Sequence, residues 1–324
     1  MAMGEWDRFH YGYVTISVVA ILLNTTVIYL FLTKKYLRNM HSNTFLFSLA
    51  ISDFCYASVA IPLLIRCEQF FKYSVCYAYE YIMVFFGYST VYHILLAITE
   101  KLCAICFPLK HHSMFCKSIA IKSSLSVWLF SIALSHIPIW WDYIFPGSPK
   151  ENMQRDEIFY KFHFATGFAL PMLMSIMMYS IILHKIFKVA NARLSEDTQS
   201  SKLRLHVEKK AACTFAIMLG AFLFSWITWF IARIYDPILN NVDIAHFFTI
   251  SRFLDPIFNP ILYTFLKNDF RRAFLSLWRS KKQNNELLQM RLTRHHCQGT
   301  GTAYTHEDLI TASPRSLKRK PFTR

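Results

Sequence analysis

The sequence predicts an all-α membrane protein: a seven-transmembrane helix bundle with a short amphipathic cytoplasmic helix after the seventh span. The first observation is composition, because the 324 residues are 54% hydrophobic and only 17% charged, with a mean hydropathy of +0.28. Such a chain is too apolar for a soluble domain of its length. The second observation is that apolar residues gather in stretches of about 20, the length of a bilayer-spanning helix. The third is that basic residues concentrate in alternate connections between these stretches.

Seven stretches have the length and the low charge of a membrane span. They are Tyr11–Thr33, Ser42–Ile65, Tyr73–Thr99, Ser123–Trp141, Phe162–His184, Ala211–Ala232 and Ile244–Leu266. The second stretch contains one charged residue, Asp53, and the third contains only Glu80. Each stretch is therefore predicted to be a transmembrane helix.

The seventh stretch carries a polar face within an otherwise apolar helix. Arg252, Asp255, Asn259 and Tyr263 step by three, four and four residues, which is the repeat of one helix face. A charged face cannot contact lipid without a cost of several kcal/mol. The stripe is therefore expected to face the interior of the bundle, where an ionisable residue indicates a functional site.

The distribution of Lys and Arg predicts the orientation, because short basic loops remain on the cytoplasmic side. The first, third and fifth connections are basic, whereas the others mix signs or lean acidic. The protein is thus expected in the plasma membrane as a multi-pass protein, with an extracellular N-terminus and a cytoplasmic C-terminus. The net charge of +15 then reflects membrane topology and not a nucleic-acid partner.

These patterns divide the chain into four parts. They are a short extracellular N-terminus (1–10), the seven-helix domain (11–266), an amphipathic helix on the inner membrane surface (267–279) and a disordered basic cytoplasmic tail (280–324).

Each span also carries a landmark, and together these resemble the rhodopsin-like (class A) family of G-protein-coupled receptors. The landmarks are Asn24, Leu49-Ala50-Ile51-Ser52-Asp53, Cys76, Glu100-Lys101-Leu102, Trp128, Pro171 with Tyr179, Trp226 and Asn259-Pro260-Ile261-Leu262-Tyr263. The resemblance covers nearly everything before the tail. It implies a receptor that binds an extracellular small ligand and activates a heterotrimeric G protein by movement of spans five and six. The tail, rich in Ser and Thr, would then be a target of receptor kinases and arrestin.

The resemblance places the ligand in the outer half of the bundle. The corresponding residues are Glu80, Met83, Val84, Gly87, His163, Phe164, Trp226, Trp229, Phe230, Arg233, Thr249, Arg252 and Phe253. Amine receptors of this family have an aspartate where Met83 stands, and Glu80, one turn further out, could substitute for it. Arg233 and Arg252 would suit an anionic ligand. The alternative is that Arg233 reaches the outer surface and Arg252 is neutralised by an acidic neighbour.

A second set resembles the polar pocket that holds a sodium ion in this family. It consists of Asn24, Asp53, Thr90, Asp255 and Asn259, with Asp53 as the metal ligand. Two carboxylates at this depth repel each other unless a cation, a proton or Arg252 intervenes. Asp255 is therefore assigned either to this pocket or to an ion pair with Arg252. The sequence indicates no other cofactor.

A third set corresponds to the activation switch and the G-protein contact. It consists of Glu100, Lys101, Pro108, Tyr179, Glu208, Pro260 and Tyr263. A contact between Lys101 and Glu208 would hold spans three and six together, and its release would open a cytoplasmic cleft. Lysine stands where the family usually has arginine and lacks the planar fork that binds bidentately. The alternative is that both are solvated interfacial charges.

Cys76 matches a family cysteine that usually pairs with one in the second outer loop, but residues 142–161 contain no cysteine. Cys67 is the one obvious partner on the outer side. A Cys67–Cys76 bridge across a short loop and two free thiols both remain open.

Two other functions remain open for a seven-helix protein. One is a receptor that does not couple, acting as a decoy or as a regulator of a partner. The other is an ion or proton transporter that uses Arg252, Asp255 and Asp53 as a relay. An enzyme is not expected, because no metal-ligand cluster or nucleophile–base pair falls on a common face.

Overall fold

The computed structural model describes residues 8–193, 213, 216–217, 220–221, 223–227 and 242–277. Within these ranges, side chains are not described at 112–113, 140, 189–193, 242 and 263–266. Most of the predicted sixth span and the whole predicted tail lie outside the described residues, as does the predicted extracellular segment up to residue 7.

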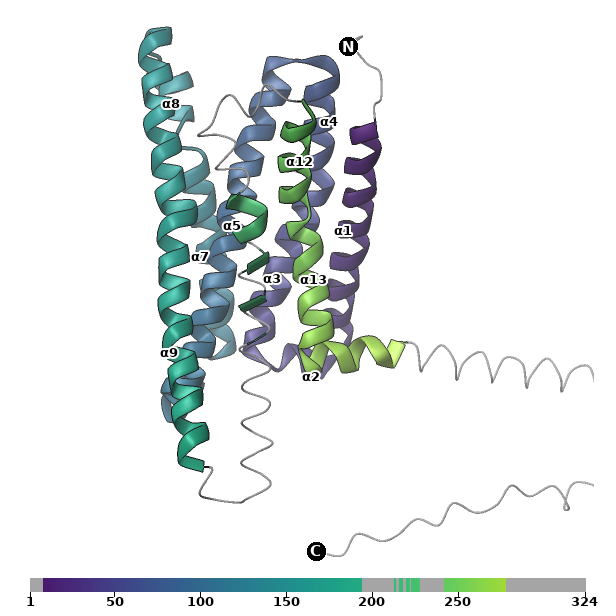
Figure 1. Ribbon diagram of the computed structural model, residues 1–324, viewed down its shortest axis with the longest axis vertical. Coiled ribbons are helices and arrows are strands. Elements are labelled where there is room, and N and C mark those ends of the chain that lie inside the picture. The colour runs from purple at the N-terminus through teal and green to yellow at the C-terminus, as the bar shows by residue number, and fades with distance from the viewer. Residues whose placement is uncertain are drawn as a thin grey trace, which may run out of the picture. The chain divides into compact units, whose positions relative to one another are not determined.

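The described residues are almost entirely helical (Figure 1). In chain order the elements are α1 (Arg8–Thr33), α2 (Lys35–Arg38), α3 (His41–Cys55), the π-helical turn η1 (Tyr56–Ala60), α4 (Ile61–Phe70), α5 (Tyr73–Cys106), α6 (Pro108–Met114), α7 (Lys117–Ser135), η2 (Trp140–Ile144), α8 (Pro149–Phe164), η3 (Ala165–Ala169), α9 (Leu170–Arg193), α12 (Val242–Phe253) and α13 (Asp255–Leu266). Residues 268–277 are also helical.

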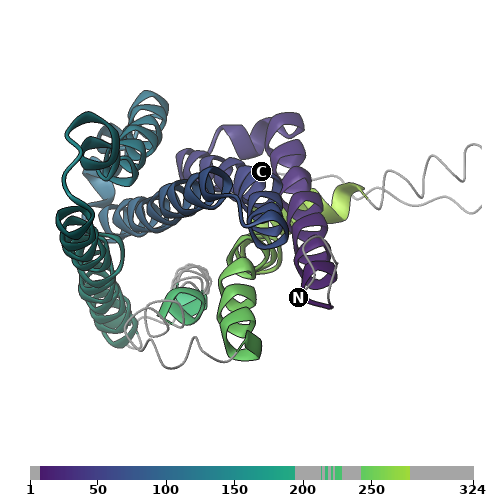
Figure 2. The ribbon, with the colours of Figure 1, turned by 90° about the horizontal axis from the view of Figure 1, so that it is seen from above.

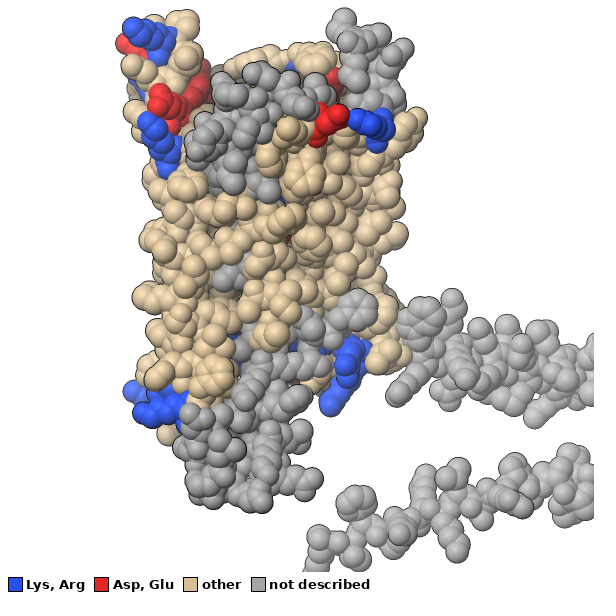
Figure 3. Space-filling view, in the orientation of Figure 1, with Lys and Arg blue, Asp and Glu red and all other residues tan. Residues whose placement is uncertain are grey.

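Five helices in the described part of the chain are long and apolar enough to cross a membrane. They are Arg8–Thr33, His41–Phe70, Tyr73–Cys106, Lys117–Ser135 and Pro149–Lys188. Figure 3 shows charged side chains gathered at the two ends of the bundle, with a wide uncharged belt between them. Large apolar side chains such as Leu22 and Leu129 are exposed on this belt. The fold therefore has the surface that a bilayer requires.

Helix α5 is the central element of the bundle. It packs against α3, α4, α7 and α9, and in the end-on view it runs between the other helices (Figure 2). Helix α13 packs against α1 and α3. Residues on the inner faces of α5 and α13 thus lie where polar side chains from several spans can meet.

The connection between spans four and five differs from the sequence-based expectation. We expected a loop over residues 142–161, but α8 begins at Pro149 and continues through η3 into α9. The start of α8 is fixed by a capping box: the Ser148 hydroxyl accepts from the Glu151 amide, and the Glu151 carboxylate accepts from the Ser148 amide. The Ser-Pro-Lys-Glu signal was present in the sequence, but the high polarity of this segment concealed it.

Span seven is interrupted at Leu254 and forms two helices of 12 residues each. Pro256 has no amide hydrogen and cannot continue the hydrogen-bond ladder of α12. The ladder restarts at Leu254, whose carbonyl accepts from the amides of Ile257 and Phe258. The break lies between Arg252 and Asp255, so the predicted continuous stripe is divided at its two charged residues.

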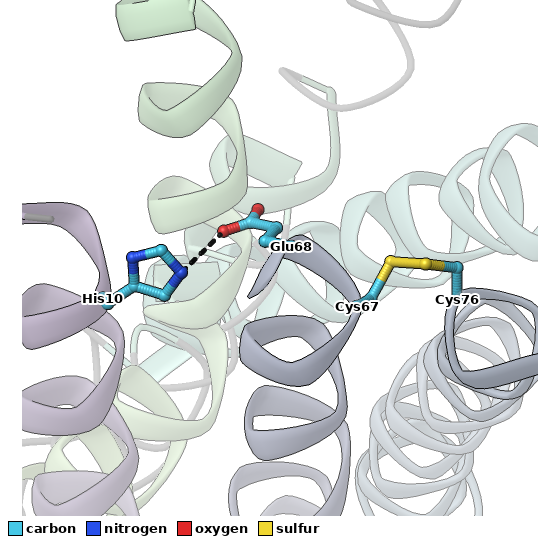
Figure 4. The surroundings of a disulfide bond; sticks show 4 residues. All are labelled: His10, Cys67, Glu68 and Cys76. Carbon is cyan, nitrogen blue, oxygen red and sulfur yellow. Dashed lines mark ion pairs between the residues drawn. A yellow bond between two sulfur atoms is a disulfide. The ribbon is translucent and has the colours of Figure 1, made fainter. Parts of the chain in front are cut away.

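Covalent and polar contacts join three helices at the end of the bundle that the sequence predicts to be extracellular (the outer end, Figure 4). A disulfide joins Cys67 of α4 to Cys76 of α5, with their Cα atoms 4.8 Å apart. His10 of α1 lies 3.6 Å from the carboxylate of Glu68. Between the two cysteines, Phe71 ends α4 in the left-handed region, with a φ of 46°. Of the two states that the sequence leaves open for Cys67 and Cys76, the structure has the bridge.

At the inner end, Lys267 joins the end of α13 to the start of α3. Its ammonium group donates to the Ser42 hydroxyl at 3.1 Å and to the Asn43 side-chain oxygen. Asn43 in turn donates to the carbonyl of Leu37. Burial lowers the pKa of Lys267 to about 8, although the nearby Glu100 carboxylate acts in the opposite direction.

We predict that the free energy of unfolding rises with pH because Lys267 releases its proton in the folded state first. Between pH 8 and 10.5 the unfolded chain holds the proton on Lys267 and the folded chain has released it, so raising the pH favours the folded state. The gain is on the order of 3 kcal/mol. Below about pH 8 both states are protonated and the contribution is constant. Unfolding midpoints of the purified protein, measured from pH 7.5 to 10.5, should rise more in the wild type than in Lys267→Met. Parallel profiles would contradict the assignment.

Candidate functional site

An acidic, tyrosine-rich cavity lies near the outer ends of α5, α7 and α8. Its volume is about 200 Å³, and its lining consists of Tyr73, Tyr77, Glu80, Tyr81, Val84, Ser135, Pro138, Asp142, Asp156, Phe159 and Tyr160. Among the described residues, this lining contains three carboxylates and no lysine or arginine. The outer cavity therefore has the charge and the aromatic surface that attract a small cation.

Helix α5 supplies the aromatic wall of the outer cavity. Tyr73, Tyr77 and Tyr81 are spaced by four residues and therefore lie on one helix face. The rings of Tyr73 and Tyr77 stack with their centroids 5.5 Å apart, and those of Tyr77 and Tyr81 meet edge to face at 4.4 Å. The same spacing places Glu80 and Val84 beside them.

Two carboxylates enter the outer cavity from outside α5. Asp142 accepts hydrogen bonds from the hydroxyls of Tyr77 and Tyr81. Asp156, on α8, accepts from the Trp141 indole at 3.0 Å. Burial, together with the negative charge of Asp156, raises the pKa of Asp142. A cation between these groups would offset this repulsion.

Glu80 is the third acid of the outer cavity. Its Oε2 atom is buried and has no hydrogen-bond partner in the described part of the chain. Buried polar atoms in proteins are nearly always hydrogen-bonded, so this oxygen is available to a ligand donor. Of the predicted ligand residues, Glu80 and Val84 line the cavity.

The other predicted ligand residues on spans three and five are packed in the bundle or lie on its surface. Met83 is fully buried. His163 is buried against the edge of the Tyr88 ring, at a centroid distance of 4.9 Å. Phe164 is 37% exposed, and its ring lies beside that of Phe168. These three residues do not line the cavity.

Gly87 is the residue that allows Trp226 to enter the bundle. A Cβ atom at position 87 would lie 2.2 Å from Cη2 of Trp226, closer than any real contact. The indole nitrogen of Trp226 donates to Asp255 at 3.4 Å. Trp226 thus connects the face of α5 below the outer cavity with the polar residues of α13.

Arg252 and Asp255 point to different partners. The Arg252 guanidinium donates to the Tyr79 hydroxyl and lies 5.9 Å from the centre of the Tyr79 ring and 5.6 Å from that of Phe253. No ion pair joins Arg252 to Asp255, although both residues are described and buried. The interruption at Leu254 accounts for this, because it removes the regular helical geometry that would place the two side chains one turn apart.

Thr249, also on α12, donates its hydroxyl to the Ala245 carbonyl of its own helix at 3.0 Å. Trp229, Phe230 and Arg233, which we predicted as ligand residues on span six, lie outside the described residues.

The residues of the predicted ion pocket form a buried polar cluster in the middle of the bundle. Asn259 donates to Asp53 at 3.1 Å, and Thr90 lies against the same carboxylate. Asn24 donates to the carbonyl of Pro256 at 2.8 Å, the residue that follows Asp255. All five predicted residues of this cluster are buried.

At the inner end of α5, the carboxylate of Glu100 pairs with His111 on α6 at 2.9 Å. Sequence reasoning placed Glu100 at the switch but did not identify this partner. Pro108 begins α6, which carries His111 on the next turn. Glu208, the predicted partner of Lys101, lies outside the described residues, so their contact stays a prediction.

Two further switch residues occupy regular helix. Tyr179 is buried on α9, and Pro260 lies inside α13. The backbone of Tyr263 continues α13, but its side chain is not described.

Nine residues of the outer cavity were not predicted as ligand residues. They are Tyr73, Tyr77, Tyr81, Ser135, Pro138, Asp142, Asp156, Phe159 and Tyr160. The four-residue spacing of the first three was a usable signal. Asp156 could be placed only by recognising that α8 extends the fifth span outward.

The sequence matches a family model. Residues 23–263 match the family described as "7 transmembrane receptor (rhodopsin family)". The histamine H2 receptor of Cavia porcellus is 26% identical, with 88% of this chain and 87% of the relative aligned. The octopamine receptor beta-2R of Chilo suppressalis is 24% identical over 80% and 76% of the two chains, and the human trace amine-associated receptor 5 is 26% identical over 76% and 78%.

We predict that Gly87→Ala destabilises the protein, because the new methyl group would displace the Trp226 ring from α5. Overpacking of this kind typically costs about 1–3 kcal/mol. The midpoint of thermal unfolding of the purified protein should therefore fall. Gly12→Ala is the matched control, since nothing lies within 4 Å of a Cβ at that position. Equal midpoints for the two variants would show that the contact does not restrict position 87.

Proposed function

The chain belongs to the rhodopsin family of seven-transmembrane receptors, and we propose that it binds a small extracellular amine and activates a heterotrimeric G protein. As a member of this family it is a multi-pass protein of the plasma membrane, a receptor for a small molecule and not an enzyme. We further propose that its N-terminus is extracellular, as the basic connections predict. Movement of spans five and six would then open the cytoplasmic side to the G protein.

The observation that carries the ligand class is the composition of the outer cavity. Three carboxylates and four tyrosines surround a space of about 200 Å³, and none of the described residues that line it is basic. A protonated amine would pair with the carboxylates and lie against the tyrosine faces. Two of the relatives are named as receptors for the amines histamine and octopamine, and a third is named a trace amine-associated receptor, which agrees with this chemistry.

The proposed amine site is displaced outward from the position that the family resemblance indicates. Met83 offers no charge to an amine, whereas Glu80 lies about one turn closer to the outer end of α5 and lines the cavity. Asp142 and Asp156 approach the same space from η2 and α8. The acids of the outer cavity would thus replace the missing aspartate.

An anionic ligand remains the competing proposal, because Arg252 is buried on the outer part of span seven. Its guanidinium is already directed at the hydroxyl and ring of Tyr79 and at the ring of Phe253. An anion would have to compete with these contacts. The outer cavity needs no such rearrangement to receive a cation, and we therefore favour the amine.

We predict that amines activate the receptor and that their acid counterparts do not. Two pairs of probes are compared: histamine with the acid imidazole-4-acetate, and octopamine with the acid 4-hydroxymandelate. G-protein activation by each probe is measured with sensors in cells. Glu80→Gln should lower amine potency at least tenfold, about 1.4 kcal/mol, because the ammonium loses a charged partner.

Glu157→Gln is the matched control for Glu80→Gln, since Glu157 is an exposed acid of α8 outside the cavity lining. It should respond to the amines like the wild type. Responses to the acids that disappear in Arg252→Ala would instead support the anionic ligand, and equal amine potency in Glu80→Gln would refute the proposed site.

We propose that coupling depends on Lys101 at the inner end of α5. Its neighbour Glu100 is held by His111, which leaves the lysine as the basic group of the motif that can pair with Glu208 across to span six. Lysine binds a carboxylate without the bidentate geometry of arginine, so this lock is weaker than the usual one.

The predicted outcome is that Lys101→Ala raises basal nucleotide exchange on the G protein, because the contact that holds spans three and six together is lost, whereas Lys101→Arg lowers it, because arginine binds the carboxylate bidentately. Exchange should be measured on purified receptor with purified G protein, and surface expression of both variants should be compared. A Lys101→Ala receptor with unchanged basal and agonist-driven exchange would remove this role. Wild-type protein that binds ligand without exchange would favour the non-coupling alternative.

The remaining sequence-based expectations extend the same proposal. Residues 267–279 would rest on the inner membrane surface, and the tail would be phosphorylated by receptor kinases and bound by arrestin. The buried polar cluster would hold a cation, such as the sodium ion of the family resemblance, with Asp53 as ligand. A transporter is not favoured, since the family match covers most of the chain.

A further inference from the structure

The buried polar cluster contains two carboxylates and no cationic partner. Asp53 and Asp255 are 1% and 3% exposed. No Lys, Arg or His of the described residues forms an ion pair with either carboxylate, and Arg252 is directed at Tyr79. An unpaired charge in an apolar interior costs several kcal/mol. The cluster therefore requires either bound protons or a bound cation.

Three oxygen atoms in this cluster favour the cation. Oδ1 of Asn24, Oδ1 of Asp255 and Oδ1 of Asn259 are buried and have no hydrogen-bond partner in the described part of the chain. A proton on Oδ1 of Asp255 would have no acceptor within hydrogen-bond distance, so protonation would leave this atom unsatisfied. A hard cation is coordinated by oxygen atoms, at 2.3–2.6 Å for Ca²⁺, and it can use oxygens that accept no hydrogen bond.

The amide nitrogens are already engaged, which fixes the direction of the oxygens. Asn24 donates to the carbonyls of Ala20 and Pro256, and Asn259 donates to Asp53. Each amide therefore leaves its oxygen as the free acceptor. Among the described residues, no three His, Cys, Asp or Glu side chains gather in one place, so the two amides must complete the donor set.

The charge of the cluster determines which cation fits. Sodium would neutralise one carboxylate and leave the other unpaired, whereas a divalent ion neutralises both. We propose that this cluster binds a divalent cation, Ca²⁺ in first place, and that Asp255 sets its preference over Na⁺. Ca²⁺ accepts the irregular geometry of donors from α1, α3 and α13, whereas Mg²⁺ demands an octahedron. With only two carboxylates, the dissociation constant should be about 10⁻⁴–10⁻³ M.

This inference rests on the proposed cation in the cluster and is independent of the amine and of coupling. The experiment uses the full-length receptor in nanodiscs of zwitterionic lipid, without ligand or G protein. CaCl₂, MgCl₂ and NaCl are titrated at constant ionic strength, and thermal unfolding is followed. Ca²⁺ should raise the wild-type midpoint by about 3–5 °C at ten times its dissociation constant, and Na⁺ by less.

Two variants test the assignment to Asp255. Asp255→Asn should lose the Ca²⁺ response and keep the Na⁺ response, because the amide preserves the shape and removes one charge. Asp53→Asn should lose both responses. Glu157→Gln, an exposed acid paired with Lys161, is the control and should respond like the wild type.

The outcomes separate the two levels of the proposal. A wild-type protein stabilised by Na⁺ and not by Ca²⁺ or Mg²⁺ would overturn the divalent preference and leave the sodium pocket intact. A wild-type protein that responds to none of the three would overturn both. A Ca²⁺ response retained by Asp255→Asn would overturn the role of Asp255. If that variant fails to fold, the wild-type titration still decides.

Discussion

The cost of a charge in an apolar bundle is the constraint on which the polar architecture of this receptor depends. Asp53, Glu100 and Arg252 are all buried, and each is held by a hydrogen-bonding partner on another helix. These partners, Asn259, His111 and Tyr79, tie α13 to α3, α6 to α5 and α12 to α5. The polar contacts therefore fix how the helices meet, whereas the apolar surfaces alone would tolerate several arrangements.

Asp255 follows this pattern only in part: Oδ2 accepts from the Trp226 indole, Oδ1 has no hydrogen-bond partner among the described residues, and the residue lies next to the break in span seven. Pro256 interrupts the helix between Arg252 and Asp255, so the arginine turns to α5 and the carboxylate turns into the bundle. The interruption thus creates an acidic cluster that its nearest basic residue does not neutralise. A bound cation would neutralise the negative charge of this cluster.

Trp226 connects the two candidate sites of the receptor. Its ring packs against Gly87 on the central helix, and its nitrogen donates to Asp255. A ligand in the outer half that displaced this ring would also change the hydrogen bonding of the ion cluster. Coupling between the two sites would then require only that the Trp226 side chain can adopt two conformations.

Two local features of the chain shape the outer end of the bundle. The Ser148 capping box starts α8 at Pro149, and the Cys67–Cys76 bridge closes the short turn between α4 and α5. Together they place the acids of α8 and η2 over the tyrosine face of α5. Residues 142–161 contain no cysteine, so no disulfide bond attaches this connection to α5.

The sequence alone determined the helical class, the positions of the spans and the family, because these follow from local hydrophobicity and short motifs. Through the family resemblance of the motifs that contain them, it also placed Asp53 and Asn259 in one cluster. The tertiary structure decided the partner of Arg252 and the place of Asp156. Both depend on where a helix breaks or extends and on which side chain lies opposite on a neighbouring helix. The periodicity of apolar residues along one helix carries no information about that neighbour.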